Sequence, residues 1–264
     1  MSEPVLYDVD DGVATLTLNR PDNRNALTGD MSNAIIDAVD RAEEDPDVRA
    51  LVITGTEGTF CAGGDVNSMM EMMSGAAELH EAVERIQHNT HRAIMRVAQF
   101  HLPTIAKVDG VAYGAGANLA IATDVPLAST DASISFGFRQ VGLAVDSGTS
   151  YLLPRIVGEN KAKELVFTGE LLPAEEAGEE GIFNHVYDAD EFEAEADELI
   201  QSIASGPTIA LRTSKQAISQ GLNMSLKDAL DNEAALQAQV FATQDHEEGA
   251  TAFMEGRSPE FQGE

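Results

Sequence analysis

Asp146 is the first candidate for chemistry in this sequence, because it is the only acid between Ala132 and Val157. Valine, glycine and serine surround it. A carboxylate in such a setting can cap a helix, and the residues after Asp146 have a helical pattern. It can also be a partly desolvated base that takes a proton from a substrate. On this residue alone, helix capping is the stronger interpretation.

Two glycine-rich segments precede Asp146, at residues 59–65 (TFCAGGD) and 110–118 (GVAYGAGAN). Each stands between a strand pattern and a helical pattern, so its small side chains would leave the first N–H groups of a helix bare. Two such groups aimed at one carbonyl oxygen form an oxyanion hole. The alternatives are a closely packed turn, or a dinucleotide loop. The loop fits less well, because Leu119 stands where G-x-G-x-x-G needs its last glycine.

The periodicity of the chain predicts the elements that would position these groups. Alternating residues predict a hairpin over 7–18 that turns at residues 10–12. Met31, Ile35, Ala38 and Ala42 recur at helical spacing. The alternation of strands and helices predicts an α/β fold, a sheet layered with helices. Strands are expected at residues 49–54, 104–109, 125–128 and 134–136, and helices or helix-like segments at 65–75, 78–99 and 119–123.

Beyond residue 186 the pattern is helical only, with helices expected at residues 191–204, 207–220, 225–241 and 247–253. We therefore expect a core over residues 1–204 and a C-terminal helical region over residues 205–264. The turn at Ser205 to Pro207 is the boundary between them. So much alanine and leucine in the second region predicts packing on a neighbouring subunit.

Composition limits the possible partners. The 264 residues carry 45 acids and 16 bases, a net charge of −29 that is spread along the chain. Such a surface repels phosphate backbones, so nucleic acid is not an expected partner. Dissolved salt would screen the self-repulsion, which predicts a salt-accumulating cell. No apolar run approaches a membrane span of about 20 residues, and Cys61 has no partner for a disulfide, so we expect a cytoplasmic protein without membrane contact.

Together the motifs resemble the crotonase superfamily, the enoyl-CoA hydratases and isomerases. The resemblance covers nearly the whole chain and is carried by motifs in family order. They are LNRPDNRNAL at residues 18–27, FCAGGD at 60–65, PTIAKVDG at 103–110 with the glycine-rich turn, VGLAVD at 141–146, LPRIVG at 153–158, TG at 168–169 with AEEAG at 174–178, and AFMEGR at 252–257.

The resemblance implies repeated strand–strand–helix turns, with a helical C-terminal region that builds homotrimers, often paired into hexamers. It implies a coenzyme A thioester as substrate, with no permanently bound cofactor and no metal. Two backbone N–H groups would hold the thioester oxygen. By motif, the residues implied are Ala62 and Ala115 for the oxyanion hole, Arg24, Ala26, Ala62, Asp65 and Val66 for CoA, and Phe253 and Arg257 for a neighbouring subunit's CoA, although Gly256 replaces the family's lysine there.

The chain departs from the hydratases of this family, which use two glutamates to activate water. Asn118 and Phe138 stand at those positions, in what would be the acyl pocket. Asparagine cannot take a proton from water, and phenylalanine can neither orient nor activate it. Asp146 stands where the dienoyl-CoA and phenylacetate-pathway isomerases have their acid. The local sequence looks most like the phenylacetate-pathway enzymes.

These residues predict an enoyl-CoA isomerase in which Asp146 moves a proton between the α and γ carbons. The first alternative is an enoyl-CoA hydratase of fatty-acid β-oxidation. The second is an acyl-CoA dehalogenase or hydrolase with Asp146 as nucleophile and His88 or His91 as base. The third is a non-catalytic binding protein of the same fold, which the strong negative charge disfavours.

Overall fold

The computed structural model describes residues 3–75 and 78–264. Its main sheet has six strands in the order β1-β2-β3-β4-β6-β9, antiparallel between β1 and β2 and parallel elsewhere. A second sheet has the order β5-β7-β8. The strands are β1 Val5–Asp10, β2 Val13–Leu18, β3 Ala50–Gly55, β4 Thr104–Val108, β5 Val111–Tyr113, β6 Val125–Ser129, β7 Ser133–Ser135, β8 Leu172–Pro173 and β9 His185–Tyr187.

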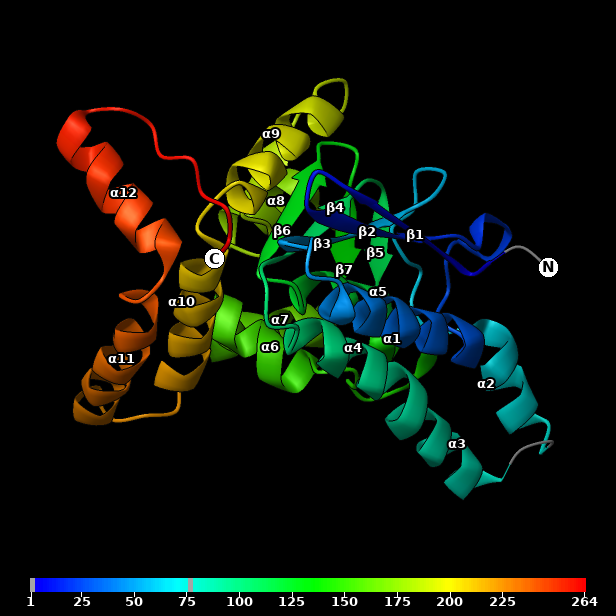
Figure 1. Cartoon of the computed structure of the whole chain (residues 1–264). Helices are drawn as coiled ribbons and strands as arrows, with labels where there is room; N and C mark the ends of the chain where they lie inside the picture. Colours follow the sequence, from blue (N-terminus) through cyan, green and yellow to red (C-terminus); the bar gives the residue numbers. More distant parts are fainter. Residues whose placement is uncertain (1–2, 76–77) are drawn as a thin grey trace.

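Helices cover the main sheet on both faces and extend the molecule beyond it (Figure 1). The α-helices are α1 Gly29–Glu44, α2 Val66–Met73, α3 Leu79–Arg85, α4 His91–Ala98, α5 Ala115–Ile121, α6 Thr149–Val157, α7 Glu159–Thr168, α8 Ala174–Glu179, α9 Phe192–Ala204, α10 Thr208–Gly221, α11 Leu226–Val240 and α12 Gln244–Glu255. Short turns are η1 Pro21–Asn23, the π-helical η2 Ile86–Thr90, and η3 Phe138–Val141.

The chain winds as a spiral in which each turn contributes a main-sheet strand, a second-sheet position and then a helix. The third turn is β4, β5 and α5. In the second turn, the second-sheet position is a single residue, Cys61, which pairs with Ala112 of β5 as an isolated bridge. In the first turn, Leu27 pairs in the same way with Gly64. The glycine-rich segments therefore occupy equivalent places in successive turns, which brings motifs about 50 residues apart into contact.

Local sequence explains the predicted elements. The hairpin between β1 and β2 turns at Asp11 and Gly12, whose φ angles of 44° and 77° fit a two-residue turn. Thr28 begins α1 by accepting a hydrogen bond from the Met31 N–H at 3.1 Å. The predicted apolar face of α1 is buried in the core. The α/β fold and its C-terminal helices are confirmed, and the division at residue 204 stays a prediction.

The helix predicted over residues 78–99 is present, but it contains an irregular turn. The π-helical η2 joins α3 to α4, and the His91 N–H bonds to the Ile86 carbonyl. Such turns add one residue to a helix and occur frequently at functional sites. Here the turn faces a cavity, because Ile86, Asn89 and Thr90 line it.

The C-terminal helices α10, α11 and α12 project from one end of the molecule, opposite α2 and α3 (Figure 1). By contrast, α9 packs on the main sheet, where Phe192, Ala196 and Ile200 are buried. Several large apolar side chains of the projecting helices are exposed, namely Ile218, Leu222, Leu226, Leu230, Phe241, Phe253 and Met254. No helix of the described residues is both long and apolar enough to cross a membrane.

Candidate active site

A cavity of about 270 Å³ lies where the two glycine-rich segments meet. The backbone of residues 62–66 and 113–115 forms one side. Apolar side chains from the α3 and η3 regions complete it, among them Ala82, Ile86, Phe138, Val141 and Leu143. Such a mainly apolar pocket with a few convergent polar groups is typical of a small-molecule site.

The two glycine-rich segments are held together by backbone pairing. The Cys61 N–H donates to the Val111 carbonyl at 3.0 Å, and the Tyr113 N–H donates to the Cys61 carbonyl at 2.9 Å. Glycine is required at Gly63, because a Cβ there would lie 2.5 Å from the Tyr113 carbonyl oxygen and 3.4 Å from the Ala115 nitrogen. The close approach sets the backbone of the two segments side by side.

The pairing decides which N–H groups face the cavity. Ala62 was expected to supply one oxyanion donor, but its N–H already donates to the Arg24 carbonyl at 2.9 Å. The Ala62 part of the prediction is therefore wrong. Gly64 is the residue that the sequence analysis missed. In the parallel bridge to Leu27, the bonds come from the residues on either side of Gly64, so its own N–H points away and has no protein acceptor among residues 3–75 and 78–264.

Ala115 is the first residue of α5, so its N–H precedes the hydrogen-bond ladder of the helix. Both Gly64 and Ala115 line the cavity. The positive end of the α5 dipole adds to the attraction for negative charge there, although α5 is only seven residues long. Gly64 and Ala115 are therefore the candidate oxyanion donors of this cavity.

Asp146 lines the same cavity and does not cap the helix that follows. The N-cap of α6 is Gly148, with φ 92° and no side-chain cap. The Asp146 carboxylate accepts a hydrogen bond from the Ser147 hydroxyl at 2.7 Å. Its backbone carbonyl, not its side chain, bonds to Thr149. The capping interpretation is thus wrong, and the half-buried carboxylate is available to a substrate.

Asn118 does not belong to the cavity lining, contrary to its expected place in the acyl pocket. It is fully buried, and its amide donates to the Gly114 carbonyl at 3.0 Å and bonds with the Thr149 hydroxyl at 2.8 Å. The Thr149 hydroxyl in turn donates to the Asp146 carbonyl at 2.9 Å. Asn118 therefore supports the turn that carries Asp146. Phe138 does line the cavity, and its ring is the nearest group to a Cβ placed at Gly114.

The predicted CoA-binding residues of the core lie at different places around the two cavities. Asp65 and Val66 line the cavity, Arg24 is exposed beside a second cavity that Ala62 also lines, and Ala26 is buried. Asp65 is occupied, since it accepts from the Asn67 N–H at 2.8 Å at the start of α2 and lies 3.5 Å from the Arg20 guanidinium.

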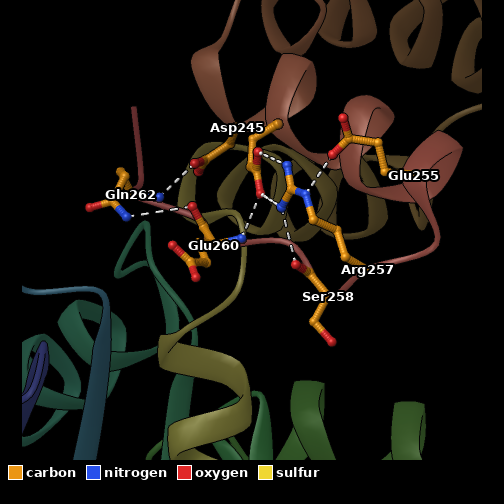
Figure 2. A network of polar contacts seen from close by, with 7 residues as sticks. Asp245, Glu255, Arg257, Ser258, Glu260 and Gln262 are labelled. Atoms are coloured by element: carbon orange, nitrogen blue, oxygen red, sulfur yellow. Dashed lines mark hydrogen bonds and ion pairs between the residues drawn. The ribbon is translucent and has the colours of Figure 1, made fainter.

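Phe253 belongs to α12 and Arg257 follows that helix by two residues, and α12 lies at the end of the molecule opposite α2 and α3 (Figure 1). Phe253 is 87% exposed. Figure 2 shows Arg257 in a polar network with Glu255 and Ser258. The Arg257 guanidinium also donates to the Glu248 carboxylate at 2.6 Å. The hydrogen bond from Arg257 lowers the pKa of Glu248 to about 2. Neither Phe253 nor Arg257 contributes to the cavity of its own chain.

Of the predicted histidines, His91 reaches the site and His88 does not. His91 Nε2 accepts the Ser147 N–H at 3.4 Å, whereas His88 is exposed. Cys61 is no nucleophile, because complete burial raises the pKa of its thiol to about 12. The chemistry available is therefore one carboxylate, two backbone donors and an apolar pocket.

Comparison with known proteins identifies the class. The Enoyl-CoA hydratase/isomerase family profile matches residues 8–264. The chain is 37% identical to the 1,2-epoxyphenylacetyl-CoA isomerase of Escherichia coli K12 over 264 residues, all of both chains. It is 33% identical to the mitochondrial methylglutaconyl-CoA hydratase of Mus musculus over 259 residues, 96% of this chain and 80% of that one. The crystal structure of an enoyl-CoA hydratase from Bacillus anthracis superposes with a TM-score of 0.92, at 29% identity, covering 99% of this chain and all of that one.

The spiral of strand–strand–helix turns and the paired backbone donors define a crotonase-fold protein. Its relatives include both isomerases and hydratases. This chain belongs to the enoyl-CoA hydratase/isomerase family.

Proposed function

We propose that this protein is an enoyl-CoA isomerase that converts a 3-enoyl-CoA into the conjugated 2-enoyl-CoA. The observation that carries the proposal is the state of Asp146. Two carboxylates line the cavity, and Asp65 is occupied by the start of α2 and by Arg20. Asp146 does not cap α6, and it lines the same mainly apolar pocket as Gly64 and Ala115. A single carboxylate beside an oxyanion hole suits proton transfer next to a thioester carbonyl.

In this mechanism the Asp146 carboxylate removes a proton from the α carbon. The electron pair of that C–H bond moves into the conjugated system and places negative charge on the thioester oxygen. The N–H groups of Gly64 and Ala115 hydrogen-bond to that oxygen, which lowers the energy of the dienolate. The protonated Asp146 then returns the proton to the γ carbon, and the double bond lies between the α and β carbons.

Hydration is the weaker candidate, because the groups that would activate water are missing. The Asn118 amide is buried against Gly114 and Thr149, and Phe138 is apolar. The nucleophilic alternative also lacks a base, since His91 Nε2 already accepts the Ser147 N–H. The E. coli relative bears the name of an isomerase, which agrees with the proposed class of reaction.

We also propose which residues bind CoA and how the chain assembles. Arg24, Ala26, Ala62, Asp65 and Val66 would contact the nucleotide and pantetheine portions. In support, Asp65 and Val66 line the first cavity, Arg24 lines the second, Ala62 lines both, and Ala26 lies in the chain between Arg24 and Leu27 of the first cavity. Phe253 and Arg257 would reach the CoA of a neighbouring subunit in a trimer or hexamer. The exposed apolar side chains of α10 to α12 support such an assembly. A cytoplasm rich in salt would suit the net charge of −29.

The test compares two reactions of the wild-type protein. Incubation with a 3-enoyl-CoA should give a steady rise in the absorbance of the conjugated thioester. Incubation with the 2-enoyl-CoA of the same chain length should give hydration at least about 100-fold more slowly, because the chain lacks a positioned group to activate water. Hydration as fast as isomerisation would replace this proposal with the hydratase alternative.

A further inference from the structure

The residue after Asp146 has an unusual backbone. Ser147 has a φ of 52°, in the left-handed region, and it is only 2% exposed. Residues other than glycine, asparagine and aspartate adopt this conformation at a cost of about 1–2 kcal/mol. Such strain is stored where the surrounding structure enforces it, frequently at active sites. The contacts of Ser147 must therefore offset the strain of its backbone.

Its hydroxyl makes the contact that matters. Ser147 Oγ donates to Asp146 Oδ1 at 2.7 Å, and it is the one protein hydrogen bond that the Asp146 carboxylate makes within the part of the chain that the structure describes. One carboxylate oxygen is therefore held, and Oδ2 has no protein partner there. The other bonds of this turn fix only the backbone: Ser147 N–H to His91 Nε2, and Thr149 to the Asp146 carbonyl.

We infer that Ser147 is a positioning residue, whose hydroxyl holds Oδ1 of the Asp146 carboxylate and so orients Oδ2 toward the substrate. The inference rests on the proposed function, since it assigns Asp146 the base. A hydroxyl that donates to a carboxylate bonds more strongly when the carboxylate is charged. The left-handed backbone folds the Ser147 side chain back toward the residue before it. Ser147 does not take the proton itself, so its effect passes through Asp146.

Other groups near the carboxylate also titrate or carry charge. Asp65 from the loop before α2, Arg85 of α3 and Tyr113 of β5 line the same cavity, and His91 of α4 contacts Ser147. His91 is the one of these groups that bonds to the turn itself. A test of Ser147 must therefore separate its hydroxyl from His91.

The experiment is the pH profile of kcat/KM for isomerisation of a 3-enoyl-CoA by the wild type and four variants. Ser147→Gly removes the hydroxyl and accepts the left-handed backbone freely, whereas Ser147→Ala removes the hydroxyl and keeps the strain. Ser150→Ala is the matched control, because Ser150 is exposed on the same helix start. His91→Gln keeps a hydrogen-bond acceptor but cannot ionise. Thermal melting of each variant shows that it is folded.

We expect both Ser147 variants to move the acidic limb of the profile to higher pH, and to lower kcat about tenfold with little change in KM. Ser150→Ala and His91→Gln should keep the limb of the wild type. If Ser147→Gly behaves as the wild type while Ser147→Ala does not, the role is one of backbone strain and the inference is overturned. A limb that disappears in His91→Gln also overturns it, because the limb then belongs to the imidazole. Absence of isomerisation in the wild type would refute the proposed function instead.

Discussion

The turn that carries Asp146 and the C-terminal arm, residues 208–264, are stabilised in different ways. In the turn, Asn118, Ser147 and Thr149 are at most 2% exposed. Asn118 and Thr149 bond to each other and to backbone carbonyls, and Ser147 donates to the Asp146 carboxylate. In the arm, exposed ion pairs such as Arg257 with Glu248 hold the last residues (Figure 2). Buried hydrogen bonds respond little to salt, whereas exposed ion pairs and unburied apolar faces depend on the solution and on partners.

Two cationic side chains tie the arm to the core. Lys215 of α10 donates to the Leu102 carbonyl at 2.9 Å and lies 2.6 Å from the Asp124 carboxylate. The Arg49 guanidinium, at the start of β3, donates to the Gly206 carbonyl at 2.6 Å and to the Thr208 hydroxyl at 2.8 Å. The Asp245 carboxylate accepts from the N–H groups of Gln262 and Gly263 and so turns the tail back onto the arm. The buried polar side chains of the turn therefore have their hydrogen-bond partners within one chain, while the arm keeps large apolar side chains exposed, which the proposed assembly would cover.

The largest effect is expected in the turn, from Asp146→Asn. The substitution keeps the shape and the backbone bonds to Thr149 but removes the proton acceptor. Turnover should fall by roughly 10²–10⁴-fold, because a positioned acid–base group is lost. Melting should change little, since the side chain caps no helix. Steady-state kinetics and a thermal melt measure the two quantities. A variant that unfolds would show instead that the carboxylate has a structural role.

Removal of the arm should abolish the proposed assembly and leave the turn that carries Asp146 folded. A chain that ends at residue 206 loses α10 to α12 with their exposed apolar side chains. We expect wild-type trimers or hexamers in light scattering and no trimer from the truncated chain. Arg49→Gln in the full chain is the control, because it cuts the anchor to Thr208 and keeps the apolar faces. A trimeric truncated chain would place the interface elsewhere.

A smaller effect is expected from Asn118→Ala, which leaves the base in place and loosens its turn. The variant removes the bonds to Gly114 and Thr149 and should lower turnover about tenfold, with a loss of about 1–3 kcal/mol in the free energy of unfolding. Thr149→Val, which removes the hydroxyl on the other side of the bond, should have a similar effect. The double variant should be less than additive, because the two residues share one network. Full additivity would show that Asn118 acts independently of the turn.

The smallest effect is expected from salt on the intact protein. Screening relieves repulsion among 45 acids, so the melting temperature should be higher in molar KCl than in dilute buffer. Sorbitol at the same osmolality is the control, since it is excluded from the surface without screening charge. Equal gains in KCl and sorbitol, or a flat response to KCl, would remove the salt-adapted interpretation.

The α/β fold could be predicted from periodicity, because buried strands and amphipathic helices each have a characteristic spacing of apolar residues in the local sequence. The β5 strand could not, since its three residues lie inside a glycine- and alanine-rich segment that has the composition of a turn. The π-helical turn η2 was also not predicted from the sequence. One added residue shifts the face of a helix without changing its composition.

The sequence singled out Asp146 by its side-chain type, and Asp146 lines the cavity; its catalytic role stays a prediction. The site could not be predicted where pairing decides the outcome. Whether Ala62 or Gly64 has a free N–H depends on bonds to Arg24 and Leu27, more than 30 residues earlier in the chain. The capping role of Asp146 was wrong because Gly148 adopts the left-handed conformation and begins α6 two residues later. Such tertiary constraints leave no local pattern.

The central claim is that one carboxylate and two backbone donors act on the same acyl thioester. The most direct measurement is a crystal structure of the Asp146→Asn variant, which would turn over slowly, with a 3-enoyl-CoA bound. We predict the thioester oxygen within about 3.1 Å of both the Gly64 and Ala115 nitrogens, and the residue 146 side chain against the α and γ carbons. A thioester oxygen that meets neither N–H group, or a residue 146 side chain that faces away from both carbons, would contradict the account.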